Sequence, residues 1–276
     1  MSTPDYQKIE AIVRKAGAML PGASGDQGPA YKKQGDANFC TEYDLAIQKY
    51  LIGEFRALMP EAAYYGEEET EGNTQDTSAD YVFYIDPIDG TTNFMKGYGH
   101  SCVSVGLSHK GKMLAGFVYD PFVDHMYVGI RGKGSTLNGR PLKGADLPIS
   151  EGLAGFDATR YNEGSGPVID VLFDLVKELF RRSLGTREGG SAALDLCRVA
   201  SSANTVYVQF VLKPYDFAAA SVIVEEAGGV LTQMDGSPCP LTGTTSMICG
   251  SPTAWAEAKD LVEELLKKHG LTLGDI

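Results

Sequence analysis

Two aspartates in one short loop carry the strongest chemical signal of the sequence. The stretch 86–94 reads Asp-Pro-Ile-Asp-Gly-Thr-Thr-Asn-Phe and follows an apolar segment typical of a strand. Asp86 and Asp89 would repel each other unless a cation lay between them, and hard divalent cations such as Mg²⁺ prefer such oxygen ligands. Gly90 lets the backbone turn without a Cβ clash, and the amides after it are expected to open a helical turn that can bind phosphate. Taken alone, the loop is explained equally well as an Asx-Pro turn with a capping aspartate.

Two further acidic sites accompany this loop. Glu67 lies in the acidic run 66–69 after an apolar segment, and Asp216 opens a helix directly after a Pro-Tyr pair. Each has a structural alternative, which is a solvated acidic run for Glu67 and a helix cap for Asp216. Together with Asp86 and Asp89 they make four acids, each at the boundary of an expected element. This combination favours a metal site.

Hydrolysis of a phosphate monoester is a reaction that such a group of acids could support. The ester dianion repels hydroxide, so the uncatalysed reaction is among the slowest in biology. Divalent metals neutralise the phosphate, lower the pKa of a bound water and stabilise the leaving alkoxide, and no covalent intermediate is then needed. The sequence contains no C-x5-R thiolate loop, no D-x-D pair and no G-x-S-x-G elbow. Covalent phosphatase and hydrolase chemistry is therefore not indicated.

The acidic motifs resemble those of the inositol monophosphatase family. The resemblance extends from about residue 5 to residue 268, and the nine-residue loop motif is its most specific part. It implies Mg²⁺-dependent, lithium-sensitive hydrolysis of a small phosphomonoester, such as inositol monophosphate or a similar polyol or sugar phosphate, by a metal-activated water. It also implies a homodimer. The segments that carry it are Gly66-Glu67-Glu68, Asp86-Pro87-Ile88-Asp89-Gly90-Thr91-Thr92-Asn93-Phe94, Gly190-Ser191-Ala192-Ala193-Leu194-Asp195, Tyr215-Asp216-Phe217-Ala218-Ala219 and Glu226-Ala227-Gly228-Gly229.

The resemblance also implies roles for individual residues. A first Mg²⁺ would be held by Glu67, Asp86 and the carbonyl of Ile88, a second by Asp86, Asp89 and Asp216, and a third, weaker ion would lie near Glu67. The residues implied in catalysis are Glu67, Thr91 and Asp44, with Thr91, supported by Asp44, orienting the attacking water. Contacts to the substrate are implied for Asp89, Gly90, Thr91, Ser191, Ala192, Asp216 and Lys33.

Two departures from the family pattern leave the substrate open. Tyr215 replaces the tryptophan that is common before the second-metal aspartate, and Gln209 replaces a glutamate that hydrogen-bonds a sugar hydroxyl. We predict that Gln209 helps to set substrate choice, with a purely structural role as the alternative. Fructose 1,6-bisphosphate, histidinol phosphate and 3′-phosphoadenosine 5′-phosphate are alternative substrates. A non-catalytic regulatory binding protein is the alternative from another class.

The elements that must position these residues follow from hydrophobic periodicity. Strands that first pair among themselves and then alternate with helices indicate two α/β subdomains, 1–150 with the Glu67 and Asp86 motifs and 151–276 with Asp216 and the substrate contacts. The expected fold is a layered αβαβα sandwich of the α/β (α+β) class, with the active site in the cleft between the subdomains. We predict a loop over 22–40, helices over 4–20, 41–58, 167–180, 190–200, 215–227 and 253–268, and strands over 81–85, 102–108, 113–119, 125–130, 153–157, 205–212 and 229–234. The 41–58 helix should begin with a capping box of Thr41 and Asp44 and bury Leu45, Leu51, Phe55 and Leu58.

Composition limits the partners and the compartment. The 276 residues carry a net charge of −12, which weighs against nucleic acid and anionic membranes as partners. No apolar run approaches the roughly 18 residues of a membrane span, and the polar start does not resemble a signal peptide. Five cysteines without C-x-x-C spacing indicate free thiols in a reducing cytoplasm. The four histidines lack metal-ligand spacing and are expected at the surface or in turns.

Overall fold

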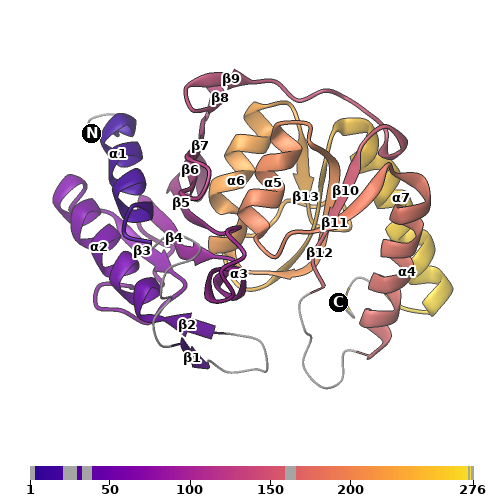
Figure 1. The fold of residues 1–276 in the computed structure, drawn as a ribbon, viewed down its shortest axis with the longest axis horizontal. Coiled ribbons are helices and arrows are strands. Elements are labelled where there is room, and N and C mark those ends of the chain that lie inside the picture. The colour runs from indigo at the N-terminus through magenta and orange to yellow at the C-terminus, as the bar shows by residue number, and fades with distance from the viewer. Residues whose placement is uncertain (1–3, 21–29, 33–38, 159–165, 273, 275–276) are drawn as a thin grey trace.

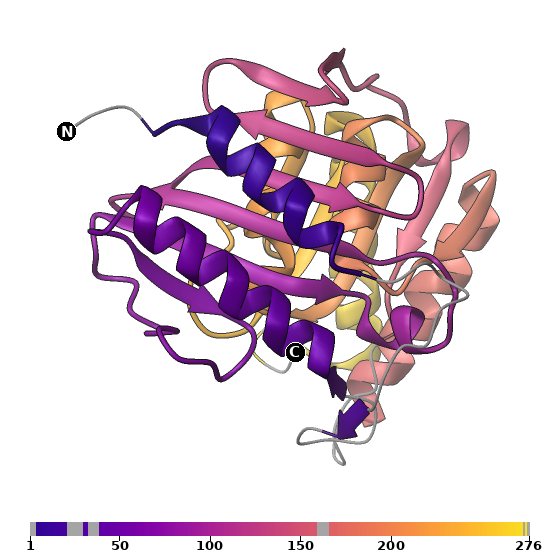
Figure 2. The same ribbon diagram turned by 60° about the vertical axis from the view of Figure 1, so that its left-hand side comes forward.

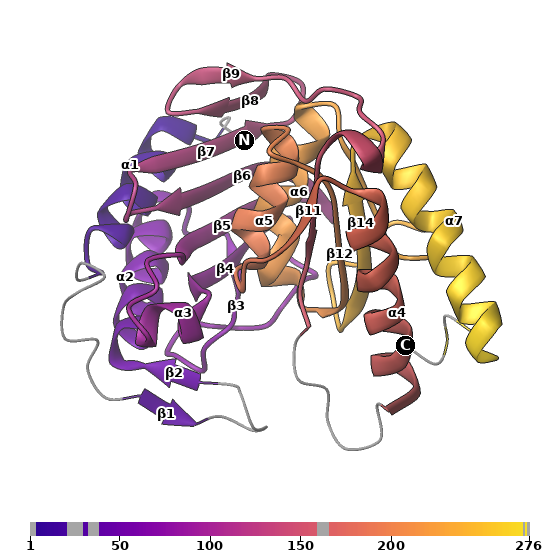
Figure 3. The same cartoon turned by 45° about the vertical axis from the view of Figure 1, so that its right-hand side comes forward.

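Three helical layers alternate with two β-sheets in the computed structural model, which describes residues 4–20, 30–32, 39–158, 166–272 and 274 (Figure 1). The outer layer on one side consists of α1 (Tyr6–Gly17) and α2 (Glu42–Leu58), the central layer of α5 (Ala192–Ala200) and α6 (Pro214–Glu226), and the outer layer on the other side of α4 (Gly166–Arg182) and α7 (Pro252–His269). The two sheets lie between these layers, as Figure 3 shows. The predicted αβαβα sandwich is confirmed.

The first sheet has seven strands in the order β3-β4-β5-β6-β7-β8-β9. Only β3 and β4 run parallel, and the other neighbours are antiparallel. Helices α1 and α2 lie across its outer face (Figure 2). The strands are β3 (Ala63–Gly66), β4 (Tyr81–Asp89), β5 (Cys102–His109), β6 (Lys112–Asp120), β7 (His125–Ile130), β8 (Gly134–Leu137) and β9 (Arg140–Leu142).

The second sheet has five strands in the order β11-β10-β12-β14-β13. Strand β10 is parallel to both β11 and β12, whereas β14 is antiparallel to β12 and β13. A short 3₁₀ turn over Ile149–Glu151 leads into this half of the chain. The strands are β10 (Leu153–Phe156), β11 (Gly185–Glu188), β12 (Asn204–Leu212), β13 (Val230–Thr232) and β14 (Thr245–Gly250).

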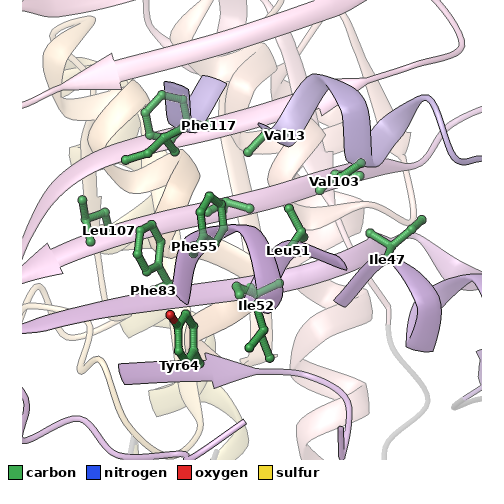
Figure 4. Close-up of a cluster of buried hydrophobic side chains, with 14 of the residues drawn as sticks. Val13, Ile47, Leu51, Ile52, Phe55, Tyr64, Phe83, Val103, Leu107 and Phe117 are labelled. Atoms are coloured by element: carbon green, nitrogen blue, oxygen red, sulfur yellow. The ribbon is translucent and has the colours of Figure 1, made fainter. Parts of the chain in front are cut away.

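Apolar clusters fill the interfaces between the layers. Figure 4 shows the cluster between α2 and the seven-stranded sheet, where the rings of Phe55 and Phe83 stack 4.2 Å apart. A second cluster joins α5 and α6 to both sheets, and a third lies between the five-stranded sheet, α4 and α7. The central helical layer thus contacts strands from both halves of the chain. The division at residue 150 stays a prediction.

Glycines on neighbouring strands bring α6 close to the seven-stranded sheet. Gly106 on β5, Gly116 on β6 and Gly129 on β7 stand side by side in the register. A Cβ atom at Gly116 would overlap the carbonyl of Ala219 in α6, and one at Gly129 would lie 2.7 Å from an α6 backbone nitrogen. Larger side chains here would lift α6 off the sheet, and the first turn of α6 carries Asp216. The glycine row therefore sets how close Asp216 comes to the aspartates of β4.

Several elements differ from the sequence-based prediction. Strands β8, β9, β11 and β14 were not predicted, and β1 (Ala30–Lys32) pairs with β2 (Phe39–Thr41) inside the predicted loop over 22–40. Helix α2 begins with the predicted capping box, but Leu45 is 37% exposed. The inner face of α2 is formed by Asp44, Ile47, Gln48 and Leu51, so Leu45 is turned outward.

Candidate active site

Strand β4 presents both of its aspartates at one end because of a β-bulge. The register passes from Asp86 opposite Ser104 to Asp89 opposite Cys102, so three steps on β4 match two on β5. Residues three apart in a regular strand point to opposite faces, and the extra residue cancels this alternation. Pro87 is tolerated in this interior strand since the bulge leaves its position without a ladder hydrogen bond.

The carboxylate of Asp89 connects this bulge to the start of α5. Its Oδ2 accepts hydrogen bonds from the Ser191 hydroxyl and from the Ala193 backbone amide, each at 2.7 Å. Burial raises its pKa from 3.8 to about 6, and these two donors oppose the rise. Ser191 is the N-cap residue of α5, and Ala192 is its first residue; both are buried. The seven-stranded sheet and the central helical layer therefore share a polar contact at this point.

Asp86 lies at the centre of a group of acids. Burial raises its pKa well above the usual range, and Glu67, Asp89, Asp216 and Asp44 raise it further. Its Oδ1 accepts a hydrogen bond from the Ile88 amide, at 3.1 Å. The mutual repulsion of these carboxylates is the clearest electrostatic feature of the region, because each acid opposes the ionisation of the next.

Asp216 brings a further carboxylate from the C-terminal half of the chain, more than a hundred residues after Asp89. Pro214 occupies the first turn of α6, and the Asp216 Oδ2 accepts a hydrogen bond from the Lys213 amide, at 2.6 Å. Burial raises the pKa of Asp216, with the charges of Asp89 and Glu67 adding to the effect. The carboxylate thus has the cap role, and its role as a metal ligand stays a prediction.

Buried Asp44 and half-buried Thr91 form a pair beside these acids. The Asp44 Oδ2 accepts hydrogen bonds from the Thr41 amide at 2.7 Å and the Thr41 hydroxyl at 2.5 Å. The Thr91 hydroxyl lies 3.3 Å from the Asp44 Oδ1 and 3.0 Å from the Ile88 carbonyl. Burial raises the pKa of Asp44 to about 7. The predicted pairing of Thr91 with Asp44 is present.

Asn93 fastens the loop after β4 to the turn before α5. Its amide nitrogen donates to the carbonyls of His100 at 2.9 Å and Gly189 at 2.8 Å. Gly90, at φ +87°, caps α3 (Thr91–Met95), the predicted helical turn. A Cβ atom on Gly90 would lie 3.0 Å from the carbonyls of Gly190 and His100, so the close approach requires glycine.

Glu67 is positioned by two side chains that the sequence motifs did not reveal. Gln48 of α2 exchanges two hydrogen bonds with the backbone of Glu68, at 2.6 and 2.9 Å. The Asn73 amide nitrogen donates to the carbonyls of Gly66 at 2.9 Å and Glu68 at 2.7 Å. These contacts join residues far apart in sequence, so only the fold reveals them.

Gln209 is engaged within its own strand. Its Oε1 accepts the Tyr207 hydroxyl at 2.5 Å, and its Nε2 donates to the Val211 carbonyl at 3.0 Å. This arrangement favours the structural alternative for Gln209. Its role in substrate choice stays a prediction.

Three other sequence-based expectations have separate outcomes. Lys33 lies outside the described residues. His100 was expected at the surface or in a turn but is only 9% exposed, and burial lowers its pKa to about 4. The five cysteines are all free, as predicted.

Asp157, which directly follows β10, is a further acid that no motif indicated. Its charge raises the pKa of Asp89, Asp195 and Asp216. It is half-buried, and its amide donates to the Val208 carbonyl at 3.3 Å. Asp157 therefore belongs to the same electrostatic neighbourhood as the predicted metal ligands.

The donor chemistry of the region fits Mg²⁺. Carboxylates and a backbone carbonyl are the hard oxygen ligands that this ion prefers. A divalent cation would offset the burial and the repulsion that raise the pKa values of Asp86, Asp89 and Asp216. Within the described ranges, no three His, Cys, Asp or Glu side chains are already closed around a single point. The acids therefore share one region, but their side chains are not drawn into a complete ligand set.

Known proteins share this fold. The structure matches that of an inositol monophosphatase from Thermotoga maritima with a TM-score of 0.84 at 25% identity, covering 96% of this chain and 98% of that one. It matches inositol monophosphatase-II of Staphylococcus aureus, solved with inositol monophosphate bound, with a TM-score of 0.77 at 28% identity, covering 96% and 97%. The same staphylococcal enzyme was also solved with 2′-AMP bound. A layered phosphatase fold with an acid-rich site is thus the class to which the structure corresponds.

Sequence comparison gives the family. The model of the inositol monophosphatase family matches residues 3–269. A relative from Neisseria meningitidis serogroup B, named putative Nus factor SuhB, is 33% identical over 226 residues, which is 81% of this chain and 84% of the relative. The chain belongs to the inositol monophosphatase family, so the resemblance of the motifs is confirmed. Among the described helices, none combines the length and apolar character needed to cross a membrane.

Proposed function

We propose that this protein is a Mg²⁺-dependent phosphatase that hydrolyses a small phosphomonoester, such as inositol monophosphate or a similar polyol or sugar phosphate. The observation that carries the proposal is the group of acids around Asp86. Burial and four neighbouring carboxylates all raise its pKa, so the group is unfavourable without positive charge. A purely structural role would not explain why the fold gathers these acids.

Two or three Mg²⁺ ions per site are proposed. Glu67, Asp86 and the carbonyl of Ile88 would hold one ion, Asp86, Asp89 and Asp216 a second, and a third, weaker ion would lie near Glu67. When bound, the ions would neutralise the phosphate, activate a water and stabilise the leaving oxygen.

The protein's own groups would orient the reactants. Thr91 would fix the position of the attacking water through its hydroxyl, which is itself held between Asp44 and the Ile88 carbonyl. Asp44 would be ionised when cations are bound nearby, and its Oδ1 would then accept a hydrogen bond from the Thr91 hydroxyl. The backbone amides after Gly90 would bind phosphate oxygens.

The alcohol part of the substrate would lie toward the five-stranded sheet. Ser191 and Ala192 are proposed to line it at the start of α5, near Asp89, with Lys33 and Gln209 as further candidate contacts. The bound inositol monophosphate of the staphylococcal relative supports a polyol phosphate. The 2′-AMP complex of the same relative keeps nucleotide, fructose 1,6-bisphosphate and histidinol phosphate substrates as alternatives.

A regulatory role is the second candidate function. It is favoured by the name of the Neisseria relative, which is a Nus factor. A protein with only this role would not need its acidic residues intact, yet Glu67, Asp86, Asp89, Thr91 and Asp216 are all present. A homodimer in the reducing cytoplasm is proposed from the resemblance to the family and from the free cysteines.

The test is hydrolysis of a panel of sugar, polyol, amino-alcohol and nucleotide phosphates and of an aryl phosphate. EDTA should abolish turnover and Mg²⁺ should restore it, while Zn²⁺ or Ca²⁺ should support little. Asp216→Asn should lose about two orders of magnitude or more in kcat, the scale of a lost electrostatic stabiliser. Full activity after exhaustive chelation, or no hydrolysis of any ester with Mg²⁺, would contradict the proposal.

A further inference from the structure

The C-terminal end of β10 points toward the proposed site. Strand β10 runs parallel to β12, with Gly155 beside Tyr207 and Phe156 beside Val208. The chain continues the pairing for one more residue, because the Asp157 amide donates to the Val208 carbonyl at 3.3 Å. Asp157 is therefore placed beside Gln209 at the end of the pairing.

The alternation along β10 decides which layer Asp157 faces. Ala154 and Phe156 pack in the apolar cluster with α4 and α7, on the outer side of the five-stranded sheet. Asp157 is one residue further, so its side chain faces the inner side, which α5 and α6 cover. Tyr207, the lateral neighbour of Gly155, belongs to the inner cluster.

The electrostatics agree with this placement. The charge of Asp157 raises the pKa of Asp89 and Asp216, which lie at the ends of β4 and at the start of α6. It also raises the pKa of Tyr207 on the inner face of β12. A half-buried carboxylate thus stands between the acids of the site and the strand that carries Gln209.

This position differs from those of the proposed metal ligands. An anion repels the phosphate of a substrate, so Asp157 is not suited to bind that group. A carboxylate in a partly desolvated place accepts strong hydrogen bonds from hydroxyl groups. The neighbouring Gln209 carries a neutral amide, which accepts the Tyr207 hydroxyl and donates to the Val211 carbonyl, so Asp157 supplies the negative charge at this edge of the sheet.

We propose that Asp157 is a specificity-determining residue that accepts a hydrogen bond from a hydroxyl of the substrate's alcohol part. It thereby replaces, from a neighbouring strand, the carboxylate that position 209 lacks. The inference rests on the proposed phosphatase function and refines its substrate class to phosphate esters of polyols and sugars.

The test compares Asp157→Asn with the wild type on inositol 1-phosphate and on phenyl phosphate, with Mg²⁺. The value of kcat/KM for inositol 1-phosphate should fall about tenfold or more, the scale of a hydrogen bond to a charged group. That for phenyl phosphate, which has no hydroxyl, should stay within about twofold of the wild type. Asp157→Ser, a second variant with a smaller side chain, should give the same pattern.

Glu188→Gln is the matched control. Glu188 stands beside Phe156 in the parallel register of β10 and β11, so it faces the outer side of the sheet. Its replacement removes the same charge from a nearby strand end, and the glutamine oxygen can still accept the bond from the Ala158 amide. The ratio of the two substrates should not change in this variant.

Four results would overturn the assignment. Equal losses on both esters, or no loss on either, would show that Asp157 belongs to the scaffold. A loss confined to phosphoethanolamine, tested in parallel, would assign the carboxylate to a cationic substrate group. A wild type that hydrolyses no ester would instead contradict the phosphatase function itself, and the assignment with it.

Discussion

Replacing Asp89 with asparagine should raise the stability of the metal-free protein while it abolishes most of the proposed activity. Burial raises the pKa of Asp89 from 3.8 to about 6, so ionisation of this group is harder in the folded than in the unfolded chain. A shift of about 2 units corresponds to roughly 3 kcal/mol at pH values above the folded pKa. Asparagine cannot ionise, so the variant avoids this cost.

The pKa of about 6 already includes the hydrogen bonds from the Ser191 hydroxyl and the Ala193 amide to the Asp89 Oδ2, because both lower it. Part of the gain is offset because asparagine places an amide nitrogen where the carboxylate has its other oxygen. A buried donor without a partner costs about 1–2 kcal/mol. The net stabilisation should be about 1–2 kcal/mol at pH 8, which raises Tm by about 2–6 °C in a domain of this size.

The pH dependence follows from the raised pKa. Protonated Asp89 is favoured in the folded chain, so the wild type is relatively stable at low pH and loses this contribution as the pH rises through about 6. The advantage of Asp89→Asn should therefore be full above pH 7, shrink through pH 6 and disappear near pH 4. Added Mg²⁺ should reverse the order, because the wild type gains binding free energy that the variant lacks.

The assay is thermal unfolding with EDTA or Mg²⁺ across this pH range, together with kcat on phenyl phosphate, which should fall about a hundredfold or more. Asp120→Asn is the control: Asp120 is buried, its Oδ1 accepts the Phe122 amide at 3.0 Å, and burial raises its pKa. Its effect on Tm should not depend on Mg²⁺, and kcat should stay near the wild-type value. A large drop in Tm for Asp89→Asn, with activity per folded molecule preserved, would refute the reasoning and make the acid structural.

Three further predictions concern inhibition, specificity and packing. Li⁺ at tens of millimolar, a concentration expected from the family resemblance, should inhibit in an uncompetitive or mixed manner, because it fits a Mg²⁺ site with half the charge. Steady-state kinetics at varied substrate concentration would show whether this inhibition is absent. Gln209→Glu should raise kcat/KM for inositol 1-phosphate relative to the protein's best substrate by roughly 1–2 kcal/mol and should hardly change turnover of phenyl phosphate; equal effects on both esters would identify Gln209 as scaffold. Gly116→Ala should destabilise the protein by about 2 kcal/mol or more in denaturant unfolding, since its Cβ would overlap the Ala219 carbonyl. Gly53→Ala, with open space around it in α2, should instead stabilise the protein by about 0.5–1 kcal/mol. Equal effects of the two substitutions would mean that α6 does not need the glycine row.

Local signals in the sequence were sufficient for most elements. Thr41 and Asp44 form the predicted capping box, and Lys110 and Gly111, between the predicted strands 102–108 and 113–119, have the positive φ values of a tight hairpin. These features depend on residues a few positions apart. The nine-residue loop likewise predicted a strand, a turn and a short helix in order, because its chemistry is local.

The missed elements depend on distant partners. Strand β14 lies between β12 and β13 in the five-stranded sheet, and its six residues show no clear alternation by themselves. Strand β11 is short and pairs with β10 across an intervening helix. Asp157 was missed for the same reason, since only the parallel register of β10 and β12 brings it to the site. Short strands, and acids that lie outside motifs, can be recognised only from their neighbours in the sheet.

Backbone amides hold the four central aspartates of the site in position. Each accepts a hydrogen bond from a backbone amide close to it in the fold: Asp44 from Thr41, Asp86 from Ile88, Asp89 from Ala193 and Asp216 from Lys213. Three of these amides lie at the starts of α2, α5 and α6, where the helix dipole favours negative charge. The amides fix one oxygen of each carboxylate without neutralising it. The other oxygen of Asp44 pairs with the Thr91 hydroxyl, whereas those of Asp86, Asp89 and Asp216 would be oriented for the proposed cations. The fold therefore tolerates the repulsion among the acids and keeps their positions set before any metal binds.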